Sequence, residues 1–137
     1  MKVLKKLAVK RLTQLADGLE LSVKDEWFDL ASWSTKGFKQ KKCGTTACAM
    51  GWAVVIFPRS KLRLVDEDNG NSDIKYKGLH GFEAAAKFMY ISESDAEYLF
   101  APSAYPDEAR ERLHVVERIR DFVDSNGCHF PEGHPSD

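Results

Sequence analysis

The stretch Cys43-Gly-Thr-Thr-Ala-Cys-Ala-Met-Gly-Trp-Ala53 decides the interpretation of this chain, because it opens the longest apolar run. The run extends from residue 47 to residue 57 and is apolar on every side of a helix. A helix of that kind is typical of the middle of a domain, and Pro58 ends it. The sequence therefore predicts a buried central helix over about residues 45–57.

Small side chains mark the beginning of this predicted helix, where Gly44 permits a turn and Thr45 or Thr46 is placed to cap. Glycine inside a helix costs about 0.5–1 kcal/mol relative to alanine. We therefore interpret Gly51 as a position where a neighbouring backbone approaches too closely for a larger side chain. A free cysteine such as Cys48 behaves there as a small buried hydrophobe. On this interpretation the segment serves packing.

Other helices are predicted before and after the central one. Apolar residues at i, i+3 and i+4 spacing predict a helix over residues 2–16, with Gly18 as its stop. Residues 82–90 have high helix propensity. Directly after them, Ser92-Glu-Ser-Asp95 resembles a capping box, which predicts the start of a further short helix.

A last helix is predicted between Pro106, which suits the first helical position, and Gly127, which closes the helix. Its predicted core positions are Ala109, Leu113, Val116, Ile119 and Val123.

One β-hairpin is predicted over about residues 61–77, because Asn69-Gly70 is a strong turn signal between two short apolar segments. The predicted fold is therefore mainly α (α+β), a small helical domain around the central helix. We expect one globular domain over residues 1–127. Residues 128–137 have two prolines and no apolar period, which predicts a loose tail.

Composition excludes several classes of protein. The formal net charge of −1 gives no overall attraction to nucleic acid or membranes. No apolar run approaches the roughly 20 residues that cross a bilayer, and the lysine-rich start lacks the apolar region of a signal peptide. Three cysteines are an odd and small number for a secreted scaffold. We expect a cytoplasmic protein without membrane contact.

A catalytic thiol is one alternative for the cysteine motif. Cys43 lies just before a predicted helix start, where unpaired N–H groups favour the thiolate. Such a nucleophile needs a base, and His80 is the candidate for it in a cysteine-dependent hydrolase or transferase. The remaining histidines are His114, His129 and His134.

A structural zinc site is the other alternative. Four residues separate Cys43 from Cys48 (C-x4-C), at the wide edge of the usual spacing for zinc ligands. Cys128 and His129 would complete the four ligands, with His134 in reserve. Because packing explains more residues of the motif, the sequence predicts no cofactor and favours a protein that is not an enzyme.

Two basic surfaces are candidates for binding a macromolecule. The first is the exposed face of the first helix, represented by Lys6 and Lys10. The second is the polar loop that precedes the cysteine motif, with Lys36, Lys39, Lys41 and Lys42. The near-neutral total charge favours a protein partner, and nucleic acid remains open. The sequence does not indicate an oligomeric state.

The chain also resembles a family of small uncharacterised proteins of bacteriophages and bacteria. The resemblance lies in Phe28-Asp-Leu, Trp33 and a "CGT-x-x-C-x-x-G-[WH]-A" core, here Cys43 to Ala53. It continues in Ala84 to Pro102, where Met89-Tyr90-Ile91 departs from the Leu-Gly-Leu-like joint of the family. The resemblance implies a phage-type accessory protein in a host cytoplasm, and it implies no chemical activity.

Overall fold

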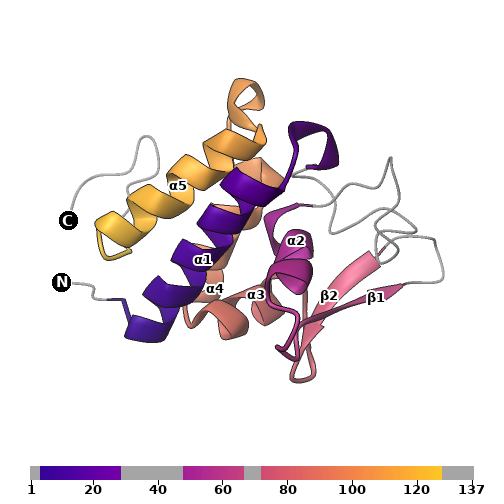
Figure 1. The fold of residues 1–137 in the computed structure, drawn as a ribbon. Coiled ribbons are helices and arrows are strands. Elements are labelled where there is room, and N and C mark those ends of the chain that lie inside the picture. The colour runs from indigo at the N-terminus through magenta and orange to yellow at the C-terminus, as the bar shows by residue number, and fades with distance from the viewer. Residues whose placement is uncertain (1–3, 29–47, 67–71, 128–137) are drawn as a thin grey trace.

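The computed structural model describes residues 4–28, 48–66 and 72–127, and it confirms the mainly α (α+β) class (Figure 1). The longer elements in chain order are α1 (Lys6–Ser22), α2 (Ala49–Ile56), β1 (Arg63–Asp66), β2 (Ser72–Tyr76), β3 (Leu79–His80), α3 (Gly81–Met89), α4 (Glu93–Phe100) and α5 (Arg112–Asp124). Three single turns of 3₁₀-helix accompany them, namely Asp25–Trp27, Pro102–Ala104 and Asp107–Ala109.

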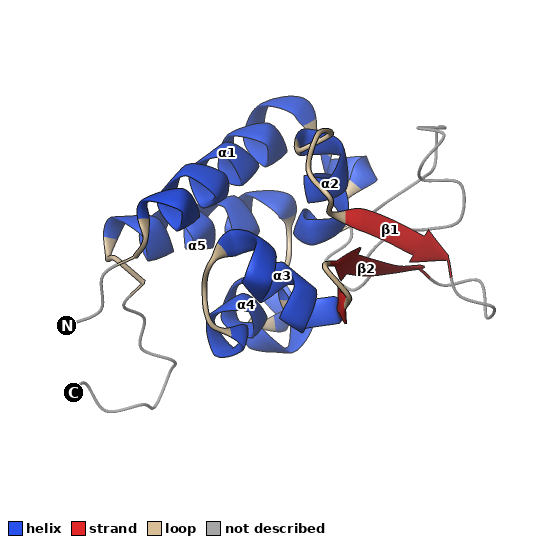
Figure 2. Ribbon diagram, turned by 90° about the horizontal axis from the view of Figure 1, so that it is seen from below, coloured by secondary structure: helices blue, strands red, loops and turns tan. Residues whose placement is uncertain are grey.

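The hydrophobic core lies between α1 and the other elements. α1 packs against α5 on one side and against α2 and α3 on the other. Figure 2 shows α3 between α1 and the small sheet, which lies at the opposite end of the molecule from the start of α1. Phe88 of α3 connects the end of α2 to the sheet. Its ring makes edge contacts with Phe57 after α2 and with Tyr76 of β2, at centroid distances of 5.1 and 5.2 Å.

The first helix runs past its predicted stop. α1 begins at Lys6 and continues through Gly18 to Ser22, so the prediction of residues 2–16 with Gly18 as the stop was wrong. Gly18 is a contact point, since a Cβ built on it would lie 2.7 Å from Cδ1 of Ile56 on α2. The close approach of two helices that the sequence suggested for Gly51 is therefore observed at Gly18, while Gly51 itself is buried in α2.

The central helix is shorter than predicted at its start. α2 begins at Ala49, and Cys48 occupies the N-cap position in an extended conformation without a side-chain cap hydrogen bond. The predicted caps Thr45 and Thr46 lie outside the described residues. The five residues from Ala49 to Ala53 are buried, which confirms a buried helix, whereas Val54, Val55 and Ile56 are half-buried.

The sheet has three antiparallel strands in the order β1-β2-β3, one more than the predicted hairpin. The additional turn is Lys77-Gly78, where both residues have positive φ (50° and 83°) as a tight two-residue hairpin requires. The predicted Asn69-Gly70 turn lies outside the described residues. Leu64, Ile74 and Tyr76 are buried, so one face of the sheet packs on the core.

Side-chain caps mark the starts of α4 and α5. Ser92 accepts a hydrogen bond from the Asp95 N–H at 3.1 Å, which confirms the predicted start of α4. Pro106 does not begin the last helix, because α5 starts at Arg112 with Glu111 as its N-cap. Its buried residues are Val115, Val116, Ile119 and Phe122. Of the predicted core positions, Leu113 is instead 47% exposed, and Ala109 and Val123 are half-buried.

The contact between Gly18 and Ile56 makes a testable prediction for a double-mutant cycle. In the parent, Gly18→Ala gains helix propensity but forces Ile56 to move, so the gain is offset. In the Ile56→Ala background the obstructing atoms are absent, and Gly18→Ala should raise the free energy of unfolding by about 1 kcal/mol. Urea denaturation of the four proteins measures the coupling, and equal effects of Gly18→Ala in both backgrounds would contradict the contact.

Candidate binding pocket at the amino-terminal end of α1

Most residues of the predicted chemical sites lie outside the described residues. These are Cys43, Cys128, His129 and His134, together with the loop lysines Lys36, Lys39, Lys41 and Lys42. Cys48 is described and is 2% exposed, so its thiol is packed in the core. Within the described ranges, no three histidine, cysteine, aspartate or glutamate side chains lie close enough together to hold a metal ion.

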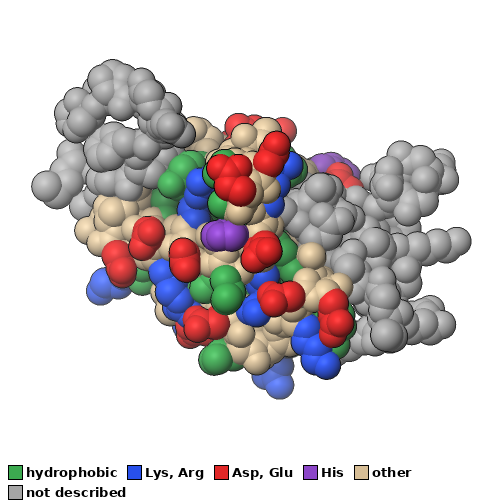
Figure 3. Space-filling view, turned by 90° about the horizontal axis from the view of Figure 1, so that it is seen from above, with side chains coloured by type: hydrophobic (Ala, Val, Ile, Leu, Met, Phe, Trp, Pro, Cys, Tyr) green, Lys and Arg blue, Asp and Glu red, His purple; other side chains and the backbone are tan. Residues whose placement is uncertain are grey.

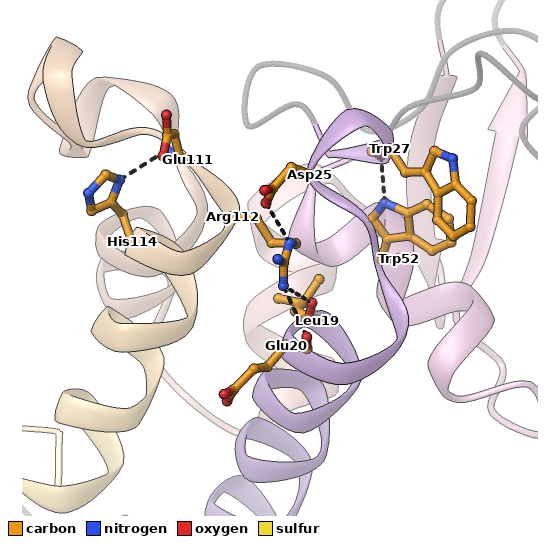
Figure 4. Close-up of polar contacts among 8 residues, drawn as sticks. All are labelled: Leu19, Glu20, Asp25, Trp27, Trp52, Glu111, Arg112 and His114. Atoms are coloured by element: carbon orange, nitrogen blue, oxygen red, sulfur yellow. Dashed lines mark hydrogen bonds and ion pairs between the residues drawn. The ribbon is translucent and has the colours of Figure 1, made fainter.

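Both described histidines have local partners. His80 ends β3, and its Nδ1 lies 3.3 Å from Oδ2 of Asp73 on the neighbouring strand. His114 closes a capping box at the start of α5, where its Nδ1 accepts the Glu111 N–H at 3.2 Å and Glu111 in turn caps the helix (Figure 4). A capping role explains the second histidine without any reaction.

Arg112 joins the end of α1 to the start of α5. Its Nε donates to Asp25 at 2.9 Å, and its Nη1 donates to the backbone oxygens of Leu19 and Glu20 at 2.7 and 3.1 Å (Figure 4). The guanidinium therefore satisfies carbonyls that the last turn of a helix leaves open. Acidic and basic side chains alternate over the face seen in Figure 3, as expected where ion pairs hold two helices together.

Two further groups of aromatic contacts are also structural. Trp52 of α2 donates its Nε1–H to the backbone oxygen of Trp27 at 2.9 Å, and the two rings stack at a centroid distance of 6.1 Å (Figure 4). Tyr105 donates its hydroxyl to the Leu99 oxygen at 2.6 Å, and the Arg118 guanidinium carbon lies 3.8 Å from the centroid of its ring. Burial raises the pKa of Tyr105 above its ordinary value, and the nearby Arg118 charge opposes that rise.

A pocket of about 360 Å³ lies where the beginning of α1 meets the joint between α3 and α4. Its lining combines apolar, basic and polar side chains: Leu4, Lys5, Ala86, Lys87, Tyr90, Ile91, Ser92 and Asp95. The volume is in the range of pockets that enclose a small ligand or a few side chains of a peptide. The lining therefore combines apolar side chains with two lysines and one aspartate.

Tyr90 is the unusual residue of this pocket. Its φ of 58° and ψ of 43° are left-handed, a conformation that a bulky residue adopts only at a cost of about 1–3 kcal/mol. Its side chain is 40% exposed, so burial of the ring does not compensate for that conformation. The ring is flanked by two cations, Lys5 Nζ at 5.9 Å and the Arg11 guanidinium carbon at 5.6 Å from its centroid. An exposed, strained aromatic between cations is typical of a recognition site.

The predicted N-terminal basic surface is only partly as expected. Lys6 and Lys10 are exposed on α1 next to the pocket-lining Lys5. Arg11 instead turns inward, because it donates to the Phe88 backbone oxygen and its guanidinium carbon lies 4.4 Å from the centroid of the Phe88 ring. The sequence did not lead us to predict the pocket. The one feature that could have indicated it is a tyrosine, Tyr90, at the joint between two helices.

No protein-family model, curated protein or solved structure matches the chain. Among the described helices, none is long and apolar enough to cross a membrane. The function is therefore inferred from the geometry alone.

The buried tyrosine makes stability depend on pH. The raised pKa of Tyr105 means that its phenol stays protonated in the folded protein, while the unfolded chain ionises near pH 10. The contribution of this protonated phenol to the free energy of unfolding is complete below about pH 10. It is lost as the pH rises above that value, by up to about 1.4 kcal/mol per pH unit. Urea denaturation between neutral pH and alkaline pH should show this loss in the parent and not in Tyr105→Phe. Parallel curves for the two proteins would refute the assignment.

The conformation of Tyr90 predicts an order of stability among its variants. Alanine keeps the left-handed strain and loses the ring, whereas glycine adopts this conformation freely. Tyr90→Gly should therefore be about 1 kcal/mol more stable to unfolding than Tyr90→Ala, the reverse of the order inside a helix. Thermal or urea denaturation measures the difference, and Glu83, exposed within α3, offers a matched control site where alanine should be the more stable variant.

Proposed function

We propose that this protein is a non-catalytic binding protein that holds a segment of a partner protein in the pocket beside Tyr90. The single observation that carries the proposal is Tyr90 itself, a left-handed, part-exposed aromatic residue that lines the pocket and contacts two cations. Backbone strain of this kind is concentrated at functional sites, and here the hydrogen bonds at the end of α3 maintain it.

The chemistry of the lining suggests what the partner segment contains. Leu4, Ala86 and Ile91 provide apolar surface for one large apolar side chain. Lys5 and Lys87 flank that surface, and they favour carboxylates on either side of the apolar residue. A short segment with an aromatic or aliphatic anchor between acidic residues would complement both features.

The same lining supports binding and offers little for bond cleavage. Its serine, Ser92, accepts the Asp95 N–H as the cap of α4, and neither described histidine lines the pocket. A nucleophile needs an adjacent base that is free to take its proton. The alternatives that use Cys43 as a nucleophile or as a zinc ligand rest on a residue outside the described ranges, so no observed contact favours them.

The proposal extends to the biological setting through sequence arguments alone. The resemblance to small phage and bacterial proteins supports a phage-type accessory protein, and the odd, low number of cysteines supports a reducing cytoplasm. Both fit a protein that acts by occupying a surface of a host protein.

Selection from a random peptide library on the immobilised protein tests the proposal. We expect enriched peptides to share a large apolar residue flanked by aspartate or glutamate. Fluorescence anisotropy should show that Tyr90→Gly weakens their binding by about 30-fold or more, as loss of a central anchor does. Lys87→Gln should weaken binding by a smaller factor, because it removes one exposed charge.

Glu117, an exposed residue of α5, provides the matched control, since Glu117→Gln should leave the affinity unchanged. The proposal fails if no peptide is enriched on the parent over Tyr90→Gly, or if the enriched peptides bind both proteins equally.

A further inference from the structure

The outward face of the sheet carries a row of basic side chains. In the strand register, Arg63 of β1 lies opposite Lys75 of β2, and Lys75 lies opposite His80 of β3. The intervening residues Leu64, Ile74 and Tyr76 are buried, so strict alternation places the row on the other face. Neighbouring strands are about 4.8 Å apart, which brings like charges side by side across the sheet.

Among the described residues, the acidic neighbours of this row are few. On the same face, Oδ2 of Asp73 lies 3.3 Å from Nδ1 of His80, so this acid is the partner of the residue at one end of the row. Within the described residues, no ion pair joins Arg63 or Lys75 to an acid, whereas Arg110, Arg112 and Arg120 each have one. Like charges directly opposite in a sheet are destabilising. The arrangement therefore places Arg63 and Lys75 side by side without an acidic partner among the described residues.

Further cations extend the row along the chain. Lys61, two residues before Arg63, and Lys77, two residues after Lys75, are both exposed. The Lys77 Nζ lies 5.4 Å from the centroid of the Tyr76 ring, which holds this charge near the sheet. Val65 is half-buried opposite Asp73 and adds a small apolar contact at the far end.

We propose that this outward sheet face, defined by Arg63, Lys75 and His80, is a second binding surface that takes a short acidic segment of a protein. Charge complementarity requires an anionic partner. A short segment fits because the row spans only three neighbouring strands. The face also lacks the exposed aromatic rings that stack bases, because Tyr76 of β2 is turned into the core.

The surface is separate from the Tyr90 pocket. The pocket lies at the beginning of α1, and the sheet lies at the other end of the molecule (Figures 1 and 2). The inference therefore stands whether or not the pocket binds a peptide.

Fluorescence anisotropy with a labelled peptide of alternating glutamate and glycine tests the inference, because such a peptide has no apolar anchor for the pocket. We expect saturable binding that weakens as salt is raised toward about 0.15 M. Arg63→Gln and Lys75→Gln should each weaken it by about three- to fivefold, the size of an exposed ion pair. Lys24→Gln, the loss of an exposed cation outside the sheet, should leave it unchanged.

Charge reversal separates binding from folding. Lys75→Glu places an acid opposite Arg63, so it should abolish peptide binding while the melting temperature stays equal or rises. Tyr90→Gly should bind the glutamate peptide as the parent does. This variant therefore distinguishes failure of the proposed sheet surface from failure of the proposed peptide pocket. Binding that survives Lys75→Glu, or that Lys24→Gln reduces equally, would overturn the inference. So would a short DNA duplex that competes more strongly than the peptide at about 0.15 M salt.

Discussion

The close approach of α1 and α2 at Gly18 is the constraint on which the rest of the structure depends. With no side chain at Gly18, Ile56 reaches the backbone of α1, and the short α2 is held against a helix twice its length. Eight residues of α2 would not form a stable helix alone, so its stability comes from this packing. The sheet and α3 then close over the same core through Phe57, Tyr76 and Phe88.

Rigid packing of this kind explains how the joint at Tyr90 is tolerated. Tyr90 donates its backbone N–H toward the last turn of α3, and the Ile91 N–H reaches the Ala86 oxygen at 3.1 Å. Arg11 fastens the same turn to α1 through the Phe88 oxygen. These bonds determine the backbone at residue 90 whatever side chain it carries. The tyrosine ring is thus presented beside the pocket by a frame that does not depend on it.

The sequence predicted the parts of the fold that local chemistry determines. The capping serine at 92, the buried helix that Pro58 follows and the mainly helical class were all readable from residue types and spacing. Gly18 was misread because a glycine in close helix contact has the same local appearance as a glycine that ends a helix. β3 was missed because two residues are too few to show alternation. In α5 the predicted core positions Val116 and Ile119 are buried, but Val115 and Phe122 complete the buried face, because the helix turns a neighbouring side toward the core.

The candidate surfaces were harder to predict, because each depends on residues that meet only in three dimensions. Lys5 and Tyr90 are 85 positions apart, and nothing local marks the tyrosine as left-handed. Arg63, Lys75 and His80 form a row only once the strand register is known. The distribution of ion pairs then carries an argument of its own. Where α1 meets α5, Arg112 and Arg120 have acidic partners that help to join the helices. Arg63 and Lys75 lie opposite each other on the sheet without such a partner among the described residues, and we infer that carboxylates of a bound segment take that place.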